Sequence, residues 1–240
     1  MTLAFSPPIV YPDSDGQPMA DNTQQFRLIV LLKENLDCLF ADNPDVFVAG
    51  DLLWYPVEGK PEIRVAPDVF VVFGRPKGDR GSYRQWQEAN ITPQVVFEIL
   101  SPGNTLREMH RKFQFYDRYG VEEYYVYDPD RHDFIGFVRE KGTLQAIDAV
   151  STWTSPRLSV RFDWAQATLN VFYPNGEPFL TTVELKAQAQ QAQQRAEQAQ
   201  QWAEQEKQRA DAAQRAIETE QQRVERLTEQ LRALGVEPNL

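Results

Sequence analysis

One short apolar run with a carboxylate inside it limits most strongly what this chain can fold into. Residues 94–100 read Gln-Val-Val-Phe-Glu-Ile-Leu and are followed at once by Ser-Pro-Gly. A run of this length, rich in Val, Phe and Ile and ended by turn-forming residues, is typical of a strand covered on both faces. The apolar interior penalises the charged form of Glu98 by several kcal/mol. We therefore expect Glu98 to be protonated, paired or bound to a cation.

The residues after this strand predict a helix that packs back against it. Thr105 and Glu108 have the spacing of a capping box, which predicts a helix from Thr105 to about Gly120. Its apolar residues form one stripe that we expect to face the sheet: Leu106, Met109, Phe113 and Tyr116. Lys112 borders this stripe, so its ammonium could reach the end of the preceding strand.

A second carboxylate opens another apolar strand. Asp68 follows Pro67 and precedes the run Val69–Phe73. An Asp in this position is commonly only a turn cap, but its combination with Glu98 favours a functional role. Asp51 also precedes an apolar segment, and there a turn role after Gly50 is the simpler interpretation.

Composition divides the chain into four parts. Residues 1–20, rich in Pro, Asp and Gly, predict an irregular N-terminal arm, and residues 21–183 contain nearly all the aromatic residues and predict one globular α/β domain. In this domain we expect a mixed sheet flanked by helices. Residues 184–234, almost all Ala, Gln, Glu and Arg without Gly or Pro, predict a long helix, and residues 235–240 form the C-terminal end.

The long helix has the heptad pattern of a coiled coil. Counted from Ala189, every a position is apolar: Ala189, Ala196, Ala203, Ala210, Ile217, Val224 and Leu231. Alanine buries little surface and two d positions are Glu206 and Glu220, so association should be weak at first and firmer from Ile217 onward. We expect homo-oligomers through residues 189–234; a solvated single helix is the alternative.

Charge and cysteine content exclude several classes of protein. The net charge of −10 and pI of about 4.8 have the wrong sign for a protein that holds DNA by bulk electrostatics, so a nucleic-acid contact must be local and metal-assisted. The single cysteine, Cys38, excludes a disulfide within the chain and favours a reducing compartment. No apolar run is long enough to cross a bilayer, so we expect a soluble cytoplasmic protein that does not bind membranes.

Asp68, Glu98 and Lys112 together are suited to metal-dependent hydrolysis of phosphodiester bonds. Two carboxylates provide the oxygen ligands that Mg²⁺ prefers, with Mn²⁺ as a substitute, and leave room for a phosphate and a water. A nearby ammonium can orient that water or offset developing negative charge. The two histidines, His110 and His132, lie in unrelated segments, so neither a zinc site nor a histidine-based nuclease is indicated.

The order of these residues resembles the Uma-type restriction endonuclease family of the PD-(D/E)XK nuclease superfamily. The matching motifs, over residues 20–175, are Pro67-Asp68, the stretch 98–105, Lys112 with Tyr116, and the stretch 124–129. The resemblance implies a restriction-endonuclease-like fold, a DNA substrate, and Asp68 and Glu98 as metal ligands. The superfamily's lysine lies two residues after the second acid, where this chain has Leu100, and Lys112 could fill that gap from the helix.

Two other functions compete with the endonuclease. One is a catalytically inactive module that binds nucleic acid or protein and is displayed on a coiled coil, favoured by Leu100 and the acidic charge. The other is a carboxylate-pair glycosidase, disfavoured because no aromatic sugar platform is evident. For contacts with a nucleic-acid backbone, Arg107, Arg111 and Arg118 around Lys112 are better candidates than the basic segment 74–90.

Overall fold

The computed structural model describes residues 9–164 and 169–234 and contains two compact units, Met1–Leu180 and Thr181–Leu240. The predicted C-terminal end, residues 235–240, and the first eight residues of the predicted arm lie outside the described residues. Within the first unit, residues 9–22 form neither helix nor strand. They are held by contacts such as the Tyr55 hydroxyl, which donates to the Pro12 carbonyl at 2.7 Å.

A six-stranded mixed sheet forms the centre of the first unit. Its strands lie in the order β1, β3, β5, β6, β7, β8. Their bounds are Val46–Gly50, Val69–Phe73, Val95–Ile99, Glu123–Asp128, Asp133–Glu140 and Thr143–Ala146. Only β5 and β6 pair in parallel, and every other neighbouring pair is antiparallel. The predicted α/β class with a mixed sheet is confirmed.

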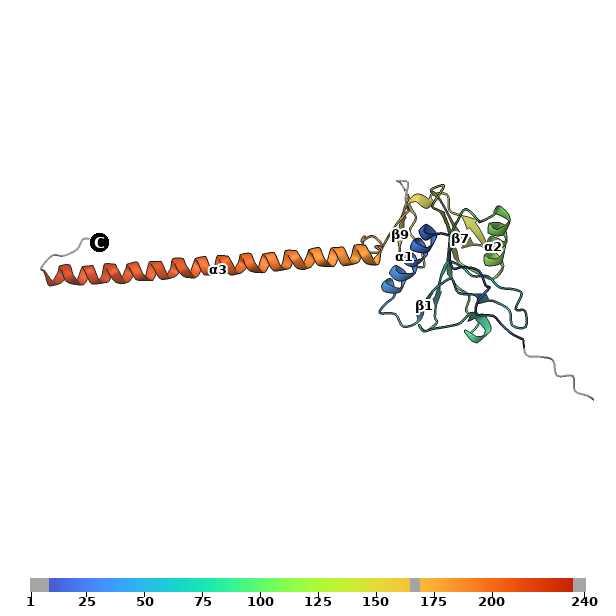
Figure 1. Ribbon diagram of the computed structural model, residues 1–240, viewed down its shortest axis with the longest axis horizontal. Helices are drawn as coiled ribbons and strands as arrows, with labels where there is room; N and C mark the ends of the chain where they lie inside the picture. Colours follow the sequence, from blue (N-terminus) through green and yellow to red (C-terminus); the bar gives the residue numbers. More distant parts are fainter. Residues whose placement is uncertain (1–8, 165–168, 235–240) are drawn as a thin grey trace, which may run out of the picture. The chain divides into compact units, whose positions relative to one another are not determined.

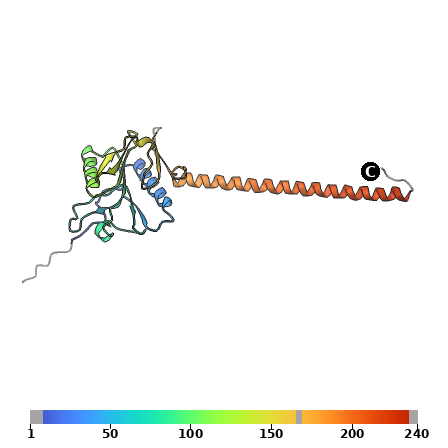
Figure 2. The same cartoon turned by 180° about the vertical axis from the view of Figure 1, so that it is seen from behind.

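Helix α1 (Thr23–Leu39) covers one face of this sheet and α2 (Leu106–Arg118) covers the other (Figures 1 and 2). Because side chains alternate along a strand, Val69 and Val71 pack into the core on the α1 side. Phe70 and Val72 pack on the opposite side, with Tyr116 of α2. The same alternation along β5 turns Glu98 toward α2.

Smaller elements surround the sheet. Strands β2 (Trp54–Tyr55) and β4 (Tyr83–Arg84) pair in parallel, and β9 (Arg161–Asp163) pairs with β10 (Asn170–Phe172). Two 3₁₀ turns lie at Gln85–Gln87 and Val150–Thr152.

The basic segment 74–90 is more ordered than an exposed loop. Arg75 and Arg80 both bind the carboxylate of Glu88, at 2.7 and 2.8 Å. Arg84 approaches Asp13 at 3.5 Å. The guanidinium groups of this segment are therefore engaged within the protein.

The helix predicted after the central strand is present, with one of the two hydrogen bonds of the predicted capping box. The Thr105 hydroxyl accepts from the backbone N–H of Glu108, and the helix runs to Arg118. One member of the predicted apolar stripe is wrong: Leu106 is 88% exposed, whereas Tyr116 is fully buried. Leu106 is the first helical residue, where no preceding turn of the helix covers the side chain.

The second unit contains helix α3 (Thr182–Ala233), which begins with a complete capping box between Thr181 and Glu184. None of the residues of α3 is buried, including Ile217 and Val224 at the predicted a positions. Across the part of the chain that the structure describes, no helix is both long enough and apolar enough to span a membrane.

Candidate functional site

Glu98 lies at the end of β5, is 2% exposed, and is held by two side chains from α2. Its Oε2 accepts a hydrogen bond from Lys112 Nζ at 2.7 Å, and its Oε1 accepts one from the Tyr116 hydroxyl. Lys112 and Tyr116 are four residues apart, so both lie on the helix face turned to the sheet. The carboxylate inside the apolar run is therefore paired, which is one of the three states expected from the sequence.

Asp68 lies immediately before β3 and is 8% exposed. Its Oδ2 accepts from the backbone N–H of Ile99 at 2.6 Å, the residue that follows Glu98. Strands β3 and β5 are antiparallel, with Val69 opposite Phe97, so the start of one meets the end of the other. The structure thus brings Asp68, Glu98 and Lys112 to the same end of the sheet.

Asp51 is a third carboxylate at this end. It follows β1 in the left-handed region, with φ of 46°, and its N–H donates to the Asp68 carbonyl at 3.0 Å. Burial, followed by the charge of Asp15 and then that of Glu98, raises the pKa of Asp51 to about 6 against the opposing charge of Lys112. Asp51 therefore has a turn conformation and also lies beside the site.

The electrostatics of the site are dominated by burial of negative charge. Burial, followed by the charge of Glu98, raises the pKa of Asp68 to about 8, against the opposing effects of Lys112 and the Ile99 N–H. Burial alone would lower the pKa of Lys112, but Glu98 and Asp68 outweigh it and raise that pKa. Lys112 is therefore a permanent cation beside an excess of carboxyl groups.

The donors present fit a divalent cation with hard oxygen ligands. Asp68 and Glu98 provide carboxylate oxygens, and a bound cation would stabilise the ionised form of Asp68, which burial otherwise disfavours. Among the residues that the structure describes, no group of three or more His, Cys, Asp or Glu side chains is arranged to hold a metal ion. The remaining ligands would have to be water and substrate oxygens, as is usual for Mg²⁺.

Leu100, two residues after Glu98, lines an apolar cavity of about 320 Å³ beside α2. The cavity is also lined by Met109, Phe113 and Tyr124. Tyr124 carries the one buried side-chain polar atom, among the described residues, that has no hydrogen-bond partner. The side chain two residues after Glu98 is thus apolar, and the ammonium next to Glu98 comes from Lys112 on α2.

Two contacts at the site were not predicted from the sequence. The Tyr116 hydroxyl binds Glu98. The sequence indicates only that Tyr116 packs on the sheet and accompanies Lys112 in the family motif, and its place four residues after Lys112 is the one signal for this contact. The Gln25 side chain, from α1, donates to the Ile99 carbonyl at 2.8 Å across 74 residues of sequence. No local pattern could have indicated that second contact.

Comparison with known proteins gives one family and a distant structural likeness. The family model Uma2, described as "Putative restriction endonuclease", matches residues 14–171. A crystal structure described as "a putative nuclease belonging to DUF820" from Anabaena variabilis ATCC 29413 is similar with a TM-score of 0.43 and 12% identity. The alignment covers 57% of this chain and 75% of that one. No curated protein matches the chain.

Proposed function

Since the chain belongs to the Uma2 family, we propose that it is a metal-dependent endonuclease that hydrolyses phosphodiester bonds of DNA. The observation that carries the proposal is the contact of 2.7 Å between Lys112 and Glu98, beside Asp68. Two oxygen donors and an ammonium at one sheet end are what hydrolysis of a phosphodiester needs.

Each residue of the site has a separate task in this reaction. Asp68 and Glu98 would hold Mg²⁺ or Mn²⁺, which when bound polarises a phosphoryl oxygen and acidifies a water. Tyr116 fixes one oxygen of Glu98 and so orients the carboxylate. Lys112, cationic at neutral pH, would orient the attacking water or offset the negative charge that develops on the phosphate.

Nicking of supercoiled plasmid with Mg²⁺ tests this function. We expect wild type to cut, Glu98→Gln to be inactive, and Lys112→Ala to be strongly impaired. Glu140→Gln, which removes an exposed carboxylate from the same sheet, is the matched control and should cut like wild type. Cutting by Glu98→Gln at the wild-type rate, or metal-independent cutting, contradicts the proposal.

A catalytically inactive module that binds nucleic acid or protein is the second candidate. Two observations favour it: Leu100 in place of the usual lysine, and the absence, among the described side chains, of a ready group of three metal ligands. Titration of Mg²⁺ and Mn²⁺ distinguishes the two candidates. Equal binding of both ions by wild type, Asp68→Asn and Glu98→Gln supports the module.

We also propose that α3 forms homo-oligomers through residues 189–234. Ile217, Val224 and Leu231 recur at heptad spacing and are all at least 38% exposed in the single chain, so a second copy could bury them. Sedimentation should give an oligomer for wild type and a monomer for Ile217→Lys/Val224→Lys. A monomeric wild type contradicts this assignment.

The single cysteine also leads us to place the protein in the reducing cytoplasm.

A further inference from the structure

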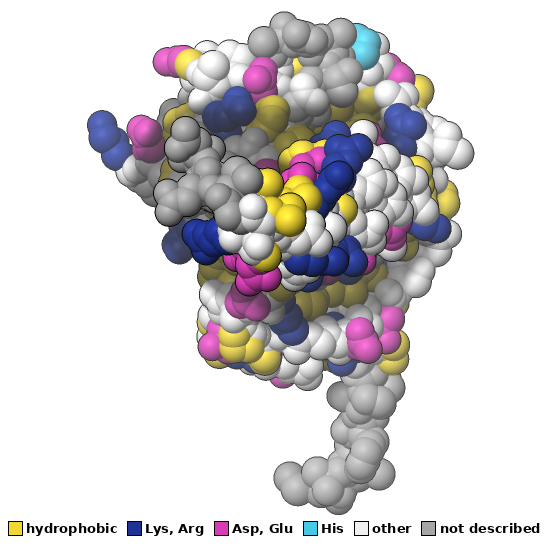
Figure 3. Space-filling view, turned by 90° about the vertical axis from the view of Figure 1, so that its left-hand side faces the viewer, with side chains coloured by type: hydrophobic (Ala, Val, Ile, Leu, Met, Phe, Trp, Pro, Cys, Tyr) yellow, Lys and Arg dark blue, Asp and Glu magenta, His cyan; other side chains and the backbone are white. Residues whose placement is uncertain are grey.

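Three of the unpaired arginines of the first unit lie on one helix. Most arginines there bind an acid or a carbonyl, as Arg139 does with Asp117 at 3.3 Å and Arg157 with Glu122 at 2.6 Å. Among the described residues of that unit, the guanidinium groups without such a partner are those of Arg27, Arg107, Arg111 and Arg118. On the face shown in Figure 3, basic and acidic side chains are intermingled. The three unpaired cations of α2 thus form a local positive group in a protein whose net charge is −10.

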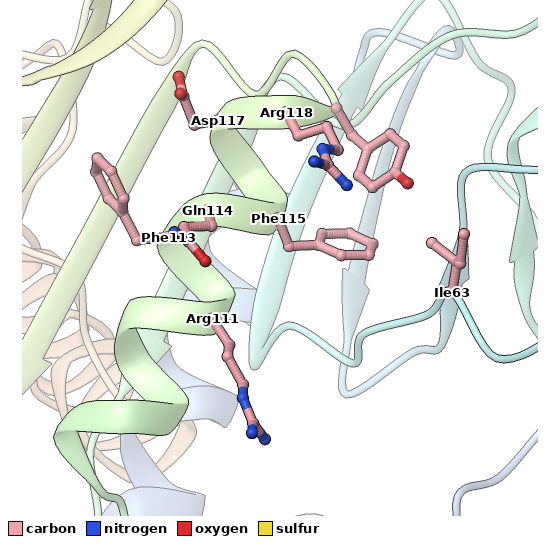
Figure 4. A pocket seen from close by; sticks show the side chains of 8 residues that line it. Ile63, Arg111, Phe113, Gln114, Phe115, Asp117 and Arg118 are labelled. Atoms are coloured by element: carbon pink, nitrogen blue, oxygen red, sulfur yellow. The ribbon is translucent and has the colours of Figure 1, made fainter.

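Arg111 and Arg118 border a hollow of about 610 Å³ beside α2. Its other lining side chains include Gln114 and Phe115 from the helix, Tyr119 directly after it, and Ile63 from the segment between β2 and β3. In Figure 4, Phe115 and Arg118 project from α2 toward Ile63, whereas Phe113 and Asp117 project to the other side. The hollow thus combines two free cations with the partly exposed rings of Phe115 and Tyr119.

The spacing of the two cations indicates the kind of anion that fits. Seven helical residues place them about 10 Å apart along the helix axis. That distance is too long for one phosphate to bridge but suits a chain of phosphates, which repeat about every 3.4 Å of axis in each strand of a duplex. A polyanion could therefore engage Arg111 and Arg118 together.

The aromatic rings indicate whether a nucleic acid bound in the hollow would be single-stranded or double-stranded. In a duplex the faces of the bases are stacked on one another and cannot reach a side chain in a hollow, whereas unpaired bases can stack on aromatic rings. Phe115 and Tyr119, with ring centroids 4.6 Å apart and planes tilted by 56°, provide two such rings in the hollow that the arginines border. The hollow and the site share helix α2, because Lys112, which binds Glu98, follows Arg111 in the sequence.

We propose that this hollow binds an unpaired segment of the nucleic-acid strand, with its phosphates on Arg111 and Arg118 and a base against Phe115 or Tyr119. The substrate would then be DNA with a single-stranded stretch, such as a flap, an end or a melted region. This assignment rests on the proposed function for the identity of the polymer. It does not require that the protein cuts.

Fluorescence anisotropy with the full chain in EDTA, where no cutting occurs, tests the assignment. The probes are labelled dT₁₂ and a 12-base-pair duplex. We expect dT₁₂ to bind at least about tenfold more tightly than the duplex. Arg111→Gln/Arg118→Gln should weaken dT₁₂ binding about tenfold and lower the slope of log affinity against log salt by about 1.4, since each phosphate contact contributes about 0.7.

Two further variants separate stacking and general charge from specific contacts. Tyr119→Leu should weaken dT₁₂ binding about fivefold without changing the salt slope. Arg27→Gln/Lys141→Gln removes two exposed positive charges elsewhere and should bind like wild type. Circular dichroism melts check that each variant is folded.

The outcomes distinguish this inference from the nuclease proposal. Wild-type affinity in the double arginine variant, an equal loss in the Arg27/Lys141 control, or duplex bound as tightly as dT₁₂ each overturns the inference. Failure of wild type to bind dT₁₂ while plasmid is nicked overturns the inference alone. The expected dT₁₂ binding without metal-dependent cutting supports the inference and contradicts the hydrolase.

Discussion

Glu98 and Glu123 are buried carboxylates on the two parallel strands, yet their surroundings differ. They are 2% and 1% exposed, and lie near opposite ends of β5 and β6, where Glu98 is opposite Val126 and Glu123 is opposite Val95. Glu123 accepts from the Arg157 N–H at 2.7 Å, the Tyr125 hydroxyl at 2.8 Å and the Ser155 hydroxyl. Its donors are neutral groups of the protein core.

Glu98, in contrast, is bound by a cation and lies beside a second acid. Lys112 satisfies one oxygen, and Asp68 adds a carboxyl group whose pKa is raised to about 8 by burial first and by Glu98 second. Burial alone therefore does not distinguish a site from a structural network. The identity of the partners does, because Glu123 is hydrogen-bonded by three fixed donors whereas Glu98 has a cationic partner and a second carboxyl group beside it.

The largest expected difference between the two residues is in catalysis. Glu98→Gln should lower the rate of Mg²⁺-dependent plasmid nicking by about 10³-fold or more, because it removes an anionic ligand. Glu123→Gln should keep the rate within about threefold, since Glu123 is at the other end of its strand. Initial nicking rates at equal folded concentration measure both effects. Similar losses in the two variants would contradict the distinction.

The free energy of unfolding should depend more on Glu123 than on Glu98, the reverse of the order expected for catalysis. Glu123→Ala leaves three donors without an acceptor in the core and should lower the free energy of unfolding by about 3 kcal/mol. Glu98→Ala should lower it by less, because the lost bonds to Lys112 and Tyr116 are offset in part by relief of the charge crowding at Asp68. Urea denaturation in EDTA measures both. A larger loss for Glu98→Ala would show that Glu98 is also a structural residue.

Metal-free protein should lose stability with rising pH through Asp68. Its folded pKa of about 8 exceeds the usual value of 3.8, so the folded state holds the proton more tightly. The free energy of unfolding should fall between about pH 4 and pH 8, by up to about 1.4 kcal/mol per pH unit relative to Asp68→Asn. Urea denaturation at pH 5, 6 and 7 measures this difference, and excess Mg²⁺ should reduce its slope. A difference that is independent of pH in EDTA would contradict the burial of Asp68.

The smallest expected effects come from the two tyrosines that hold the glutamates. Tyr116→Phe and Tyr125→Phe each remove one hydroxyl donor and should lower the free energy of unfolding by about 1 kcal/mol. Only Tyr116→Phe should also slow nicking, by about tenfold, because it frees the orientation of Glu98. Equal effects of both variants on nicking would argue against an orienting role for Tyr116.

Local sequence patterns predicted the strand that carries Glu98 and the helix that carries Lys112. The apolar run around Glu98 indicated a buried strand, and the capping box located the start of α2 and thus Lys112. Glu123 was not recognised as buried, because it follows Glu122 at a strand start and its partners Ser155 and Arg157 are 32 and 34 residues away. Such pairings depend on the order of strands in the sheet, which periodicity does not contain.

The same limit explains the errors on the surface. The apolar spacing of Leu106 gave no information on where the covered part of the sheet ends. The charge pattern of segment 74–90 likewise does not indicate that Arg75 and Arg80 both bind Glu88, which lies 13 and 8 residues further along the chain.

Helix α2 carries Lys112 and Tyr116 on its inner face and Arg111 and Arg118 on its outer face. A turn of this helix about its axis would move both sets of side chains at once, because they share one rigid backbone. Binding of a nucleic-acid strand to the outer face of α2 could therefore change the distance between Lys112 and Glu98 on its inner face. Substrate engagement and readiness for chemistry would then be mechanically linked.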